Sequence, residues 1–258
     1  MVRAASVAVA VGVVLVAAVA VVARDVVRSG DRGRRRALLI AVGASVVVLV
    51  VMVTPTIVEQ VVTTPGNLTQ LLDAHGLQKA VLVGHSLGGM VALQMWARHP
   101  ERVAGLVLAA SSPAFGHGSG DFQQAFVAQR LAPLEAGKSM RDVAEGLVPS
   151  MVAPGFDGPG LAQAKVCMGS ITPAAYKAAL GALVQFEQRA ILPSITVPTL
   201  CIAAEHDRTA APTVVQRMAD KIPNAQYQYL SGVGHLLTFE QPDSFAQTLL
   251  SFLRSIHD

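Results

Sequence analysis

A serine lies at the centre of the motif GHSLG, residues 84–88, in a setting that suits a nucleophile. The apolar residues 79–84 predict a short strand before it, and residues 90–99 predict a helix after it. Such a strand–turn–helix exposes the serine hydroxyl at a sharp turn, because the flanking glycines let strand and helix approach closely. We therefore interpret Ser86 as a nucleophile, against the alternative of an ordinary serine in a glycine-rich turn. The amide of Leu87, at the positive end of the helix, is then an oxyanion-hole donor.

Two further residues are candidates for activating this serine. Asp207 follows the apolar stretch 199–204, and His235 lies in the loop GVGH that follows the stretch 227–230. Both stretches predict strands, and the catalytic groups of open α/β sheets gather at the carboxyl ends of strands. The histidine would take the serine proton and later return it. The aspartate would hold the imidazole in the required tautomer and stabilise the imidazolium that forms.

Neighbouring acidic and histidine side chains have simpler explanations. Glu205 is a rival of Asp207 for the role of the acid. His206 lacks a glycine-rich loop, and its side chain should point away from that of Asp207. His85 is expected to pack below the serine turn. Glu240 is interpreted as a structural residue near the start of the final helix.

Helices are expected around the predicted strands. Residues 67–76 have an amphipathic pattern that ends in glycine, which is typical of a helix C-terminus. Residues 113–191 predict several short helices, one of them opened by Thr172 as the N-cap and Pro173 at the first position. Aromatic and methionine residues recur through this insert. Together they indicate an apolar pocket, the usual character of small-molecule sites.

Three stretches of the chain resemble the α/β-hydrolase fold family. Residues 79–112 resemble its nucleophile turn and following strand, residues 192–212 its acid strand and loop, and residues 222–253 its last strand, histidine loop and closing helix. The order serine, aspartate, histidine along the chain agrees with that fold. The resemblance implies a mostly parallel sheet, with residues 113–191 forming a helical lid. Residues 171–195 are most similar to the enol-lactonase and small carboxylesterase branch.

The resemblance implies a serine hydrolase that cleaves a carboxylic ester, thioester or lactone through an acyl-enzyme on Ser86. The expected substrate is a small apolar ester or lactone, and neither a cofactor nor a metal is implied. Cofactor-free haloperoxidase activity, which uses the same three residues, is a sister activity. A function of a different class stays open, namely a membrane-tethered hydrolase-like domain with weak or no catalysis that serves in binding.

The resemblance begins near residue 60, and the family's upstream parts are not recognisable. The family has further strands there and a His-Gly loop that donates the second oxyanion N–H; His75-Gly76 lies too close to the nucleophile strand to be that loop. We therefore expect a sheet of about four strands, incomplete on its N-terminal side and with one exposed edge. Either a hairpin formed by the N-terminal residues replaces the missing strands, another chain covers the edge, or the sequence is a damaged or mis-assembled form of an ordinary hydrolase.

The N-terminal part contains two uncharged, mostly apolar stretches, residues 4–23 and 37–53, each long enough for a transmembrane helix. The arginine-rich residues 24–36 between them favour a cytoplasmic loop. We therefore predict a transmembrane hairpin within residues 1–58, followed by an extracytoplasmic hydrolase domain over residues 59–258. The alternatives are a signal peptide, or buried parallel strands, which also consist of continuous apolar residues. Without a membrane segment the protein would be cytoplasmic.

Charge and cysteine content narrow the function classes. Seven arginines against two aspartates give residues 1–36 a net charge of +5, so the remaining chain sums to −2 of the total +3. The basic character therefore does not indicate a nucleic-acid surface, which needs lysine and arginine gathered on one folded face. Cys167 and Cys201 belong to no Cys/His cluster typical of zinc sites, and we expect two free thiols.

Overall fold

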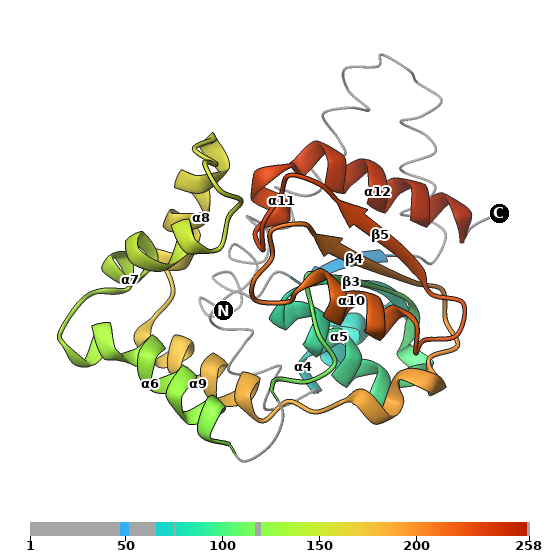
Figure 1. Ribbon diagram of the computed structural model, residues 1–258. Helices are drawn as coiled ribbons and strands as arrows, with labels where there is room; N and C mark the ends of the chain where they lie inside the picture. The colour runs from blue at the N-terminus through green and yellow to red at the C-terminus, as the bar shows by residue number, and fades with distance from the viewer. Residues whose placement is uncertain (1–46, 52–65, 75, 117–119, 257–258) are drawn as a thin grey trace.

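A parallel sheet forms the centre of the protein. The computed structural model describes residues 47–51, 66–74, 76–116 and 120–256 (Figure 1). In this part of the chain the sheet has five strands in the order β1-β2-β3-β4-β5, and every neighbouring pair is parallel. The fold is thus that of an α/β protein with a parallel sheet and surrounding helices, as the sequence predicts.

The direction of the strands explains how distant residues meet. The strands are β1 (Val47–Val51), β2 (Ala80–His85), β3 (Val103–Ala109), β4 (Thr199–Ala204) and β5 (Gln226–Leu230). Parallel strands place their carboxyl ends at one edge of the sheet. The loops after β2, β4 and β5 therefore converge, and these loops carry Ser86, Asp207 and His235.

Three helices cover one face of the sheet. They are α4 (Gly66–Ala74), α5 (Leu87–Arg98), which a 3-10 turn (Pro100–Arg102) connects to β3, and α10 (Pro212–Ala219). Alternate side chains of the central strands, including Leu82 and Leu108, are fully buried in the core on this face. The helix α4 confirms the amphipathic helix expected at residues 67–76. It ends before Gly76, whose φ of 67° is the left-handed conformation that commonly terminates helices.

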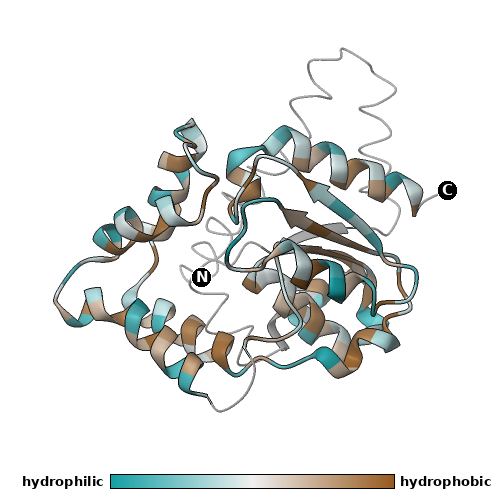
Figure 2. Ribbon diagram, viewed as in Figure 1, coloured by the Kyte–Doolittle hydropathy of each residue, from teal (hydrophilic) through white to brown (hydrophobic). Residues whose placement is uncertain are grey.

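Two helices cover the other face, namely α11 (Leu237–Glu240) and α12 (Pro242–Ser255). Val83, Val107 and Ile202 share a core cluster with Leu249 and Phe252 of α12. Both faces of the central strands are thus buried, which is why these strands are apolar over their whole length. The edge strand β5 is largely hydrophilic, and most of its side chains are at least partly exposed (Figure 2).

The segment between β3 and β4 forms a separate group of helices, called the cap below (Figure 1). Its elements are α6 (Asp121–Glu135), α7 (Met140–Leu147), a 3-10 turn (Val148–Ser150), α8 (Pro159–Gly169), α9 (Pro173–Val184) and a second 3-10 turn (Arg189–Ser194). The short helices expected in residues 113–191 are therefore confirmed. The hydroxyl of Thr172 accepts a hydrogen bond from the amide of Ala175, so Thr172 is the N-cap of α9 as predicted.

The expected helix over residues 37–53 is wrong at Val47–Val51, which form the strand β1. This strand pairs with β2 in a register that joins Val47 to Ala80 and Val51 to Gly84. β-Branched valines favour strands, and a parallel strand buried on both sides consists of a continuous apolar run. At these five residues the alternative of a strand therefore holds. The sheet has one strand more than expected, and it includes residues upstream of residue 59.

The remaining membrane prediction falls on residues outside the described ones. These are residues 4–23 and residues 37–46 and 52–53 of the second stretch. Among the helices that the structure describes, none combines the length and the apolar character needed to cross a bilayer. The predicted membrane helix at residues 4–23 stays a prediction, and so does the location of the protein. The second helix of the predicted hairpin is contradicted by β1 at Val47–Val51.

Both cysteines are free thiols, as expected. Cys167 is exposed on α8, whereas Cys201 is fully buried in β4. Burial raises the pKa of the Cys201 thiol to about 12, so this thiol stays protonated and unreactive at neutral pH.

Candidate active site

Ser86 lies at a strained turn between β2 and α5. Its φ of 52° and ψ of −118° are unusual for a residue with a side chain. The surrounding chain holds this conformation, because the Ser86 amide donates to the carbonyl oxygen of Ala109 at 2.9 Å. The buried hydroxyl of Ser111 also donates to the Ser86 carbonyl oxygen at 2.8 Å. Backbone strain that neighbours enforce in this way is typical of functional sites.

Two glycines make room for the turn. A Cβ atom at Gly84 would overlap the backbone carbonyl of Gly88, and a Cβ atom at Gly89 would overlap the side chain of Ser111. Gly84 of the motif and Gly89, which follows the motif, therefore permit the close approach of β2, the first turn of α5 and the end of β3. Close approach of the strand and the helix is also the reason why the sequence pattern predicted a nucleophile turn here.

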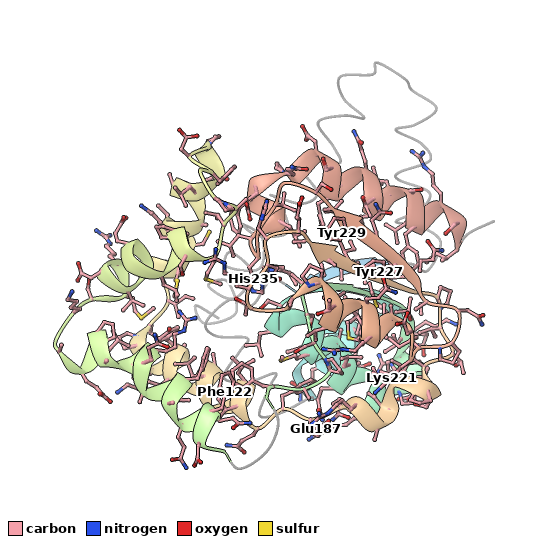
Figure 3. All side chains as sticks on the ribbon, viewed as in Figure 1. Phe122, Glu187, Lys221, Tyr227, Tyr229 and His235 are labelled. Carbon is pink, nitrogen blue, oxygen red and sulfur yellow. The ribbon has the colours of Figure 1, made fainter. Side chains whose placement is uncertain are left out.

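The structure brings Ser86, Asp207 and His235 together. The Nε2 atom of His235 lies 2.9 Å from the Oγ atom of Ser86, and its Nδ1 atom lies 2.8 Å from the Oδ2 atom of Asp207. Both distances are those of hydrogen bonds. The side chains of Asp207 and His235 are buried, with His235 only 2% exposed. Figure 3 shows His235 on the side of the sheet that faces the cap.

The Asp207 carboxylate is built to stay ionised. Its Oδ1 atom accepts hydrogen bonds from the amides of Thr209 at 2.7 Å and Ala210 at 2.9 Å, while Oδ2 faces His235. Burial by itself raises the pKa of Asp207, but the hydrogen bond and charge of His235 and the two amides outweigh it. The pKa of Asp207 is therefore held below its usual range. At neutral pH the carboxylate is therefore ionised and can accept a hydrogen bond from the His235 ring.

The backbone of His235 is fixed from two directions. Its amide donates to the carbonyl oxygen of Met151 in the cap at 2.7 Å, and its carbonyl oxygen lies 2.7 Å from Nε2 of His85. Burial and the nearby His235 lower the pKa of His85 to about 4. His85 is therefore neutral at pH 7, and its Nε2–H can donate to the His235 carbonyl oxygen. The sequence predicted that His85 packs below the turn, but it did not indicate the contact between His85 and the His235 carbonyl oxygen.

Leu87 is the first residue of α5. The first amides of a helix have no intrahelical acceptor, so the Leu87 N–H is available to a substrate oxygen. Its use as an oxyanion-hole donor stays a prediction. A second donor was expected to be missing from the residues before about 65. Residues 52–65 lie outside the part of the chain that the structure describes, and this expectation is untested.

The rival groups occupy other places. The carboxylate of Glu205 accepts a hydrogen bond from the amide of Gly232 at 2.8 Å and is exposed. The amide of His206 donates to the carbonyl oxygen of Val233, and its side chain is exposed as well. Asp207 is therefore the acid that contacts the His235 ring. Within the described residues, no group of three His, Cys, Asp or Glu side chains could hold a metal ion.

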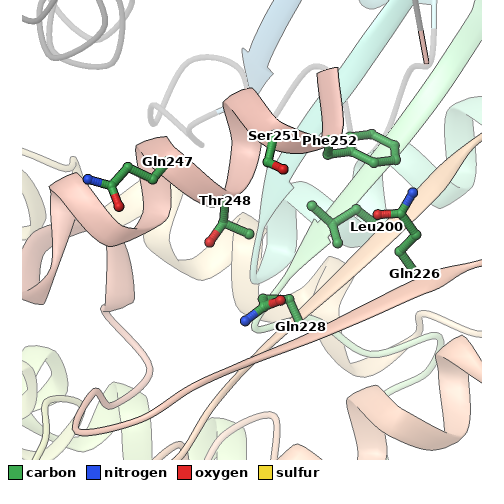
Figure 4. A pocket seen from close by; sticks show the side chains of 7 residues that line it. All are labelled: Leu200, Gln226, Gln228, Gln247, Thr248, Ser251 and Phe252. Carbon is green, nitrogen blue, oxygen red and sulfur yellow. The ribbon is translucent and has the colours of Figure 1, made fainter. Parts of the chain in front are cut away.

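A depression of about 310 Å³ lies elsewhere, between β5 and α12 (Figure 4). It is lined by Leu200, Gln226, Gln228, Gln247, Thr248, Ser251 and Phe252. None of these residues is charged, and none belongs to the group around Ser86. The depression therefore offers no chemistry of its own.

Comparison with known proteins supports a common fold. Residues 60–242 match the family described as alpha/beta hydrolase fold. A protein of Variovorax paradoxus named RutD and described as a carbamate hydrolase is 30% identical over 202 residues, which cover 74% of this chain and 71% of that protein. The 3-oxoadipate enol-lactonase 1 of Acinetobacter baylyi is 29% identical over 193 residues, which cover 74% and 70%.

A solved structure is similar as well. The thermophilic esterase from Thermogutta terrifontis superposes with a TM-score of 0.66 at 26% sequence identity. The similarity covers 74% of this chain and 71% of the esterase. The matched region of the family, residues 60–242, contains Ser86, Asp207 and His235.

Proposed function

Because this chain belongs to the α/β-hydrolase fold family and is an enzyme of that class, we propose that it cleaves a carboxylic ester, thioester or lactone through an acyl-enzyme on Ser86. The observation that carries the proposal is the hydrogen-bonded series Ser86–His235–Asp207. Its outer members are a hydroxyl on a strained turn and a buried carboxylate, and a buried imidazole lies between them. This is the arrangement that activates a serine.

The proposed reaction has two steps. The Nε2 atom of His235 takes the proton of the Ser86 hydroxyl while Oγ bonds to the substrate carbonyl carbon. The histidine then gives that proton to the leaving oxygen or sulfur, which departs and leaves an acyl-enzyme. In the second step His235 takes a proton from water and the hydroxide attacks the acyl carbon. The bond from this carbon to Oγ of Ser86 then breaks, the carboxylic acid leaves, and the proton returns from His235 to Oγ. Asp207 stabilises the imidazolium in both steps without being protonated.

The substrate class is proposed from the cap and from the similar proteins. Phe115, Phe122 and Phe126 form a contiguous aromatic cluster on the cap, with ring centroids of Phe115 and Phe126 4.8 Å apart. Such a cluster has the apolar character that is usual for small-molecule sites and suits an apolar acyl group. The names of the enol-lactonase and the esterase among similar proteins support an ester or lactone. We therefore propose a small apolar ester or lactone as the substrate.

We expect slow turnover, about 10²–10³-fold below that of a hydrolase with two oxyanion donors. The reason is that the sequence before residue 65 holds no recognisable loop that would supply a donor besides Leu87. The measurement is kcat/KM for p-nitrophenyl acetate, p-nitrophenyl butyrate and a γ-lactone, beside an enol-lactonase of this family under the same conditions. Equal rates would contradict the expectation and indicate a second donor in the N-terminal part.

The same assays separate the alternative functions. A domain that only binds hydrolyses none of these substrates, and its Ser86 does not react with a fluorophosphonate, since that reaction needs an activated serine. A haloperoxidase would brominate a phenol when it is given bromide, peroxide and a short carboxylic acid, because the peracid formed at the serine site oxidises the bromide. Hydrolysis without bromination is the result that the proposal predicts.

A further inference from the structure

Glu240 is a buried acidic residue that the proposed reaction does not use. It is the last residue of α11 and is only 9% exposed. Its Oε2 atom accepts hydrogen bonds from the amides of Ala153 at 2.7 Å and Gly234 at 2.9 Å. Its Oε1 atom lies 3.0 Å from the Gly234 amide. One carboxylate therefore joins two segments that lie far apart in the sequence.

The two segments that Glu240 joins are both close to the proposed reaction. Ala153 belongs to the cap, three residues after the end of its first 3-10 turn, and Gly234 precedes His235 in the histidine loop. The segments also touch without Glu240, because the His235 amide donates to the Met151 carbonyl oxygen at 2.7 Å. They pack so closely that a Cβ atom at Gly234 would lie 2.5 Å from the backbone of Val152. The cap segment 151–153 and the histidine loop are thus in backbone contact.

The hydrogen bonds from the Ala153 and Gly234 amides to the Glu240 carboxylate are of a strong kind. Hydrogen bonds from an N–H group to a carboxylate are about twice as strong as those between neutral groups. Removing the acceptor would leave two buried amides without partners, which is costly in a protein interior. Among the described residues, the hydrogen bond left between the two segments would be that of the His235 amide to the Met151 carbonyl oxygen, beside the apolar packing of Leu236 against the cap. The structure therefore makes Glu240 the main polar connection between the cap segment and the histidine loop.

We propose that Glu240 is a positioning residue for His235, which it holds in line with Ser86 by joining the histidine loop to the cap segment 151–153. The inference rests on the proposed function, because it assigns Glu240 a part in that same site. Glu240 acts through the backbone of Gly234 and touches no reacting atom. Its effect is on the alignment of the base, so it concerns the rate of the chemical step more than the binding of substrate.

The test is a set of variants measured with p-nitrophenyl acetate, which is too small to depend on cap contacts for binding. Glu240→Ala removes both acceptor atoms. It should lower kcat about 10–100-fold, the order expected for a misplaced catalytic group, and leave KM close to that of the wild type. Glu240→Gln should recover most of the activity, because one amide oxygen in the place of Oε2 can accept from both Ala153 and Gly234.

The matched control is Glu205→Ala. Glu205 also accepts from an amide of the histidine loop, that of Gly232 at 2.8 Å, but it is exposed and does not reach the cap. Its variant should retain kcat within about threefold, as exposed contacts contribute little. All rates are expressed per molecule that reacts with a fluorophosphonate to completion, so that a loss of folded protein is not counted as a loss of rate.

Several results would overturn the inference. The first is an unchanged kcat in Glu240→Ala, and the second is an equal loss of kcat in the Glu205→Ala control. The third is an equal loss of kcat in Glu240→Ala and Glu240→Gln, which would indicate an effect of the charge of Glu240 and not of its hydrogen bonds to Ala153 and Gly234. If the alanine variant does not fold, Glu240→Asp replaces it. Its carboxylate is one carbon too short to reach both amides, so full activity would contradict the bridge. A wild type that fails to react with the fluorophosphonate would instead refute the proposed function.

Discussion

Ser86→Ala will lower kcat for p-nitrophenyl acetate by about 10⁶-fold. The hydroxyl oxygen is the atom that would form the acyl-enzyme, and no other serine contacts His235 in the described residues. Alanine retains the Cβ atom, so the strained turn and the bond from Ser111 to the Ser86 carbonyl oxygen are unaffected. The loss is therefore expected in kcat and not in the melting temperature.

Ser170→Ala is the matched control for this variant. Ser170 ends α8 in the cap, and its hydroxyl donates only to the local carbonyl oxygen of Cys167 at 2.7 Å. Its removal should leave kcat and KM unchanged. Hydrolysis by Ser86→Ala above one per cent of the wild-type rate would mean that another group carries the reaction.

Asp207→Asn will lower kcat by about 10⁴-fold while the protein stays folded. The asparagine carbonyl oxygen can take the place of Oδ1 and accept from the amides of Thr209 and Ala210. Its NH₂ group then faces Nδ1 of His235 and donates to it. This forces the ring proton onto Nε2, the atom that must accept the proton of Ser86. The base is thus lost through the wrong tautomer.

Two comparisons make the Asp207 result specific. Asp220→Asn alters an exposed carboxylate at the end of α10, which accepts from Gln216 at 2.8 Å, and should leave the rate unchanged. His235→Ala should reduce the rate at least as much as Asp207→Asn, because it removes the base itself. If Asp207→Asn retained a tenth or more of the activity, Asp207 would not be the residue that orients His235.

The parts of the fold that were predictable from the sequence have signals that lie within a few neighbouring residues. The strands β2 and β4 are recognisable as short apolar runs. The turn at Ser86 is recognisable because β2 leads into a glycine motif, in which a Cβ atom at Gly84 would overlap the backbone of Gly88. The cap helix α9 begins at Thr172 for an equally local reason, the N-cap hydrogen bond. The positions of Asp207 and His235 follow because parallel strands bring their carboxyl ends together.

The strand β1 was not predictable in this way. The apolar residues 37–53 satisfy the length and composition of a membrane helix as well as those of a buried parallel strand. What makes Val47–Val51 a strand is its pairing with β2, whose first residue lies more than thirty positions further on. An apolar run by itself does not indicate which strand it pairs with.

The polar contacts around His235 were missed for a similar reason. Glu240 has its partners at Gly234, six residues away, and at Ala153, 87 residues away, and both partners are backbone amides. Every residue except proline has a backbone amide, so the sequence does not indicate which amides bind a side chain. The position of Glu240 five residues after His235 in the sequence is the one signal that could have drawn attention to it. The link between His85 and the His235 carbonyl oxygen is hidden in the same way.

The most direct test of the account is to identify the residue that a fluorophosphonate labels. The full-length protein is incubated with the probe, digested, and the modified peptide is sequenced by mass spectrometry. The account predicts one adduct per chain, on Ser86, formed by the wild type and by Ser170→Ala, absent from Ser86→Ala, and strongly slowed in Asp207→Asn. An adduct on any other residue of the wild type, or rapid labelling of Asp207→Asn at the wild-type rate, would contradict the assignment of Ser86 as a nucleophile activated by His235 and Asp207.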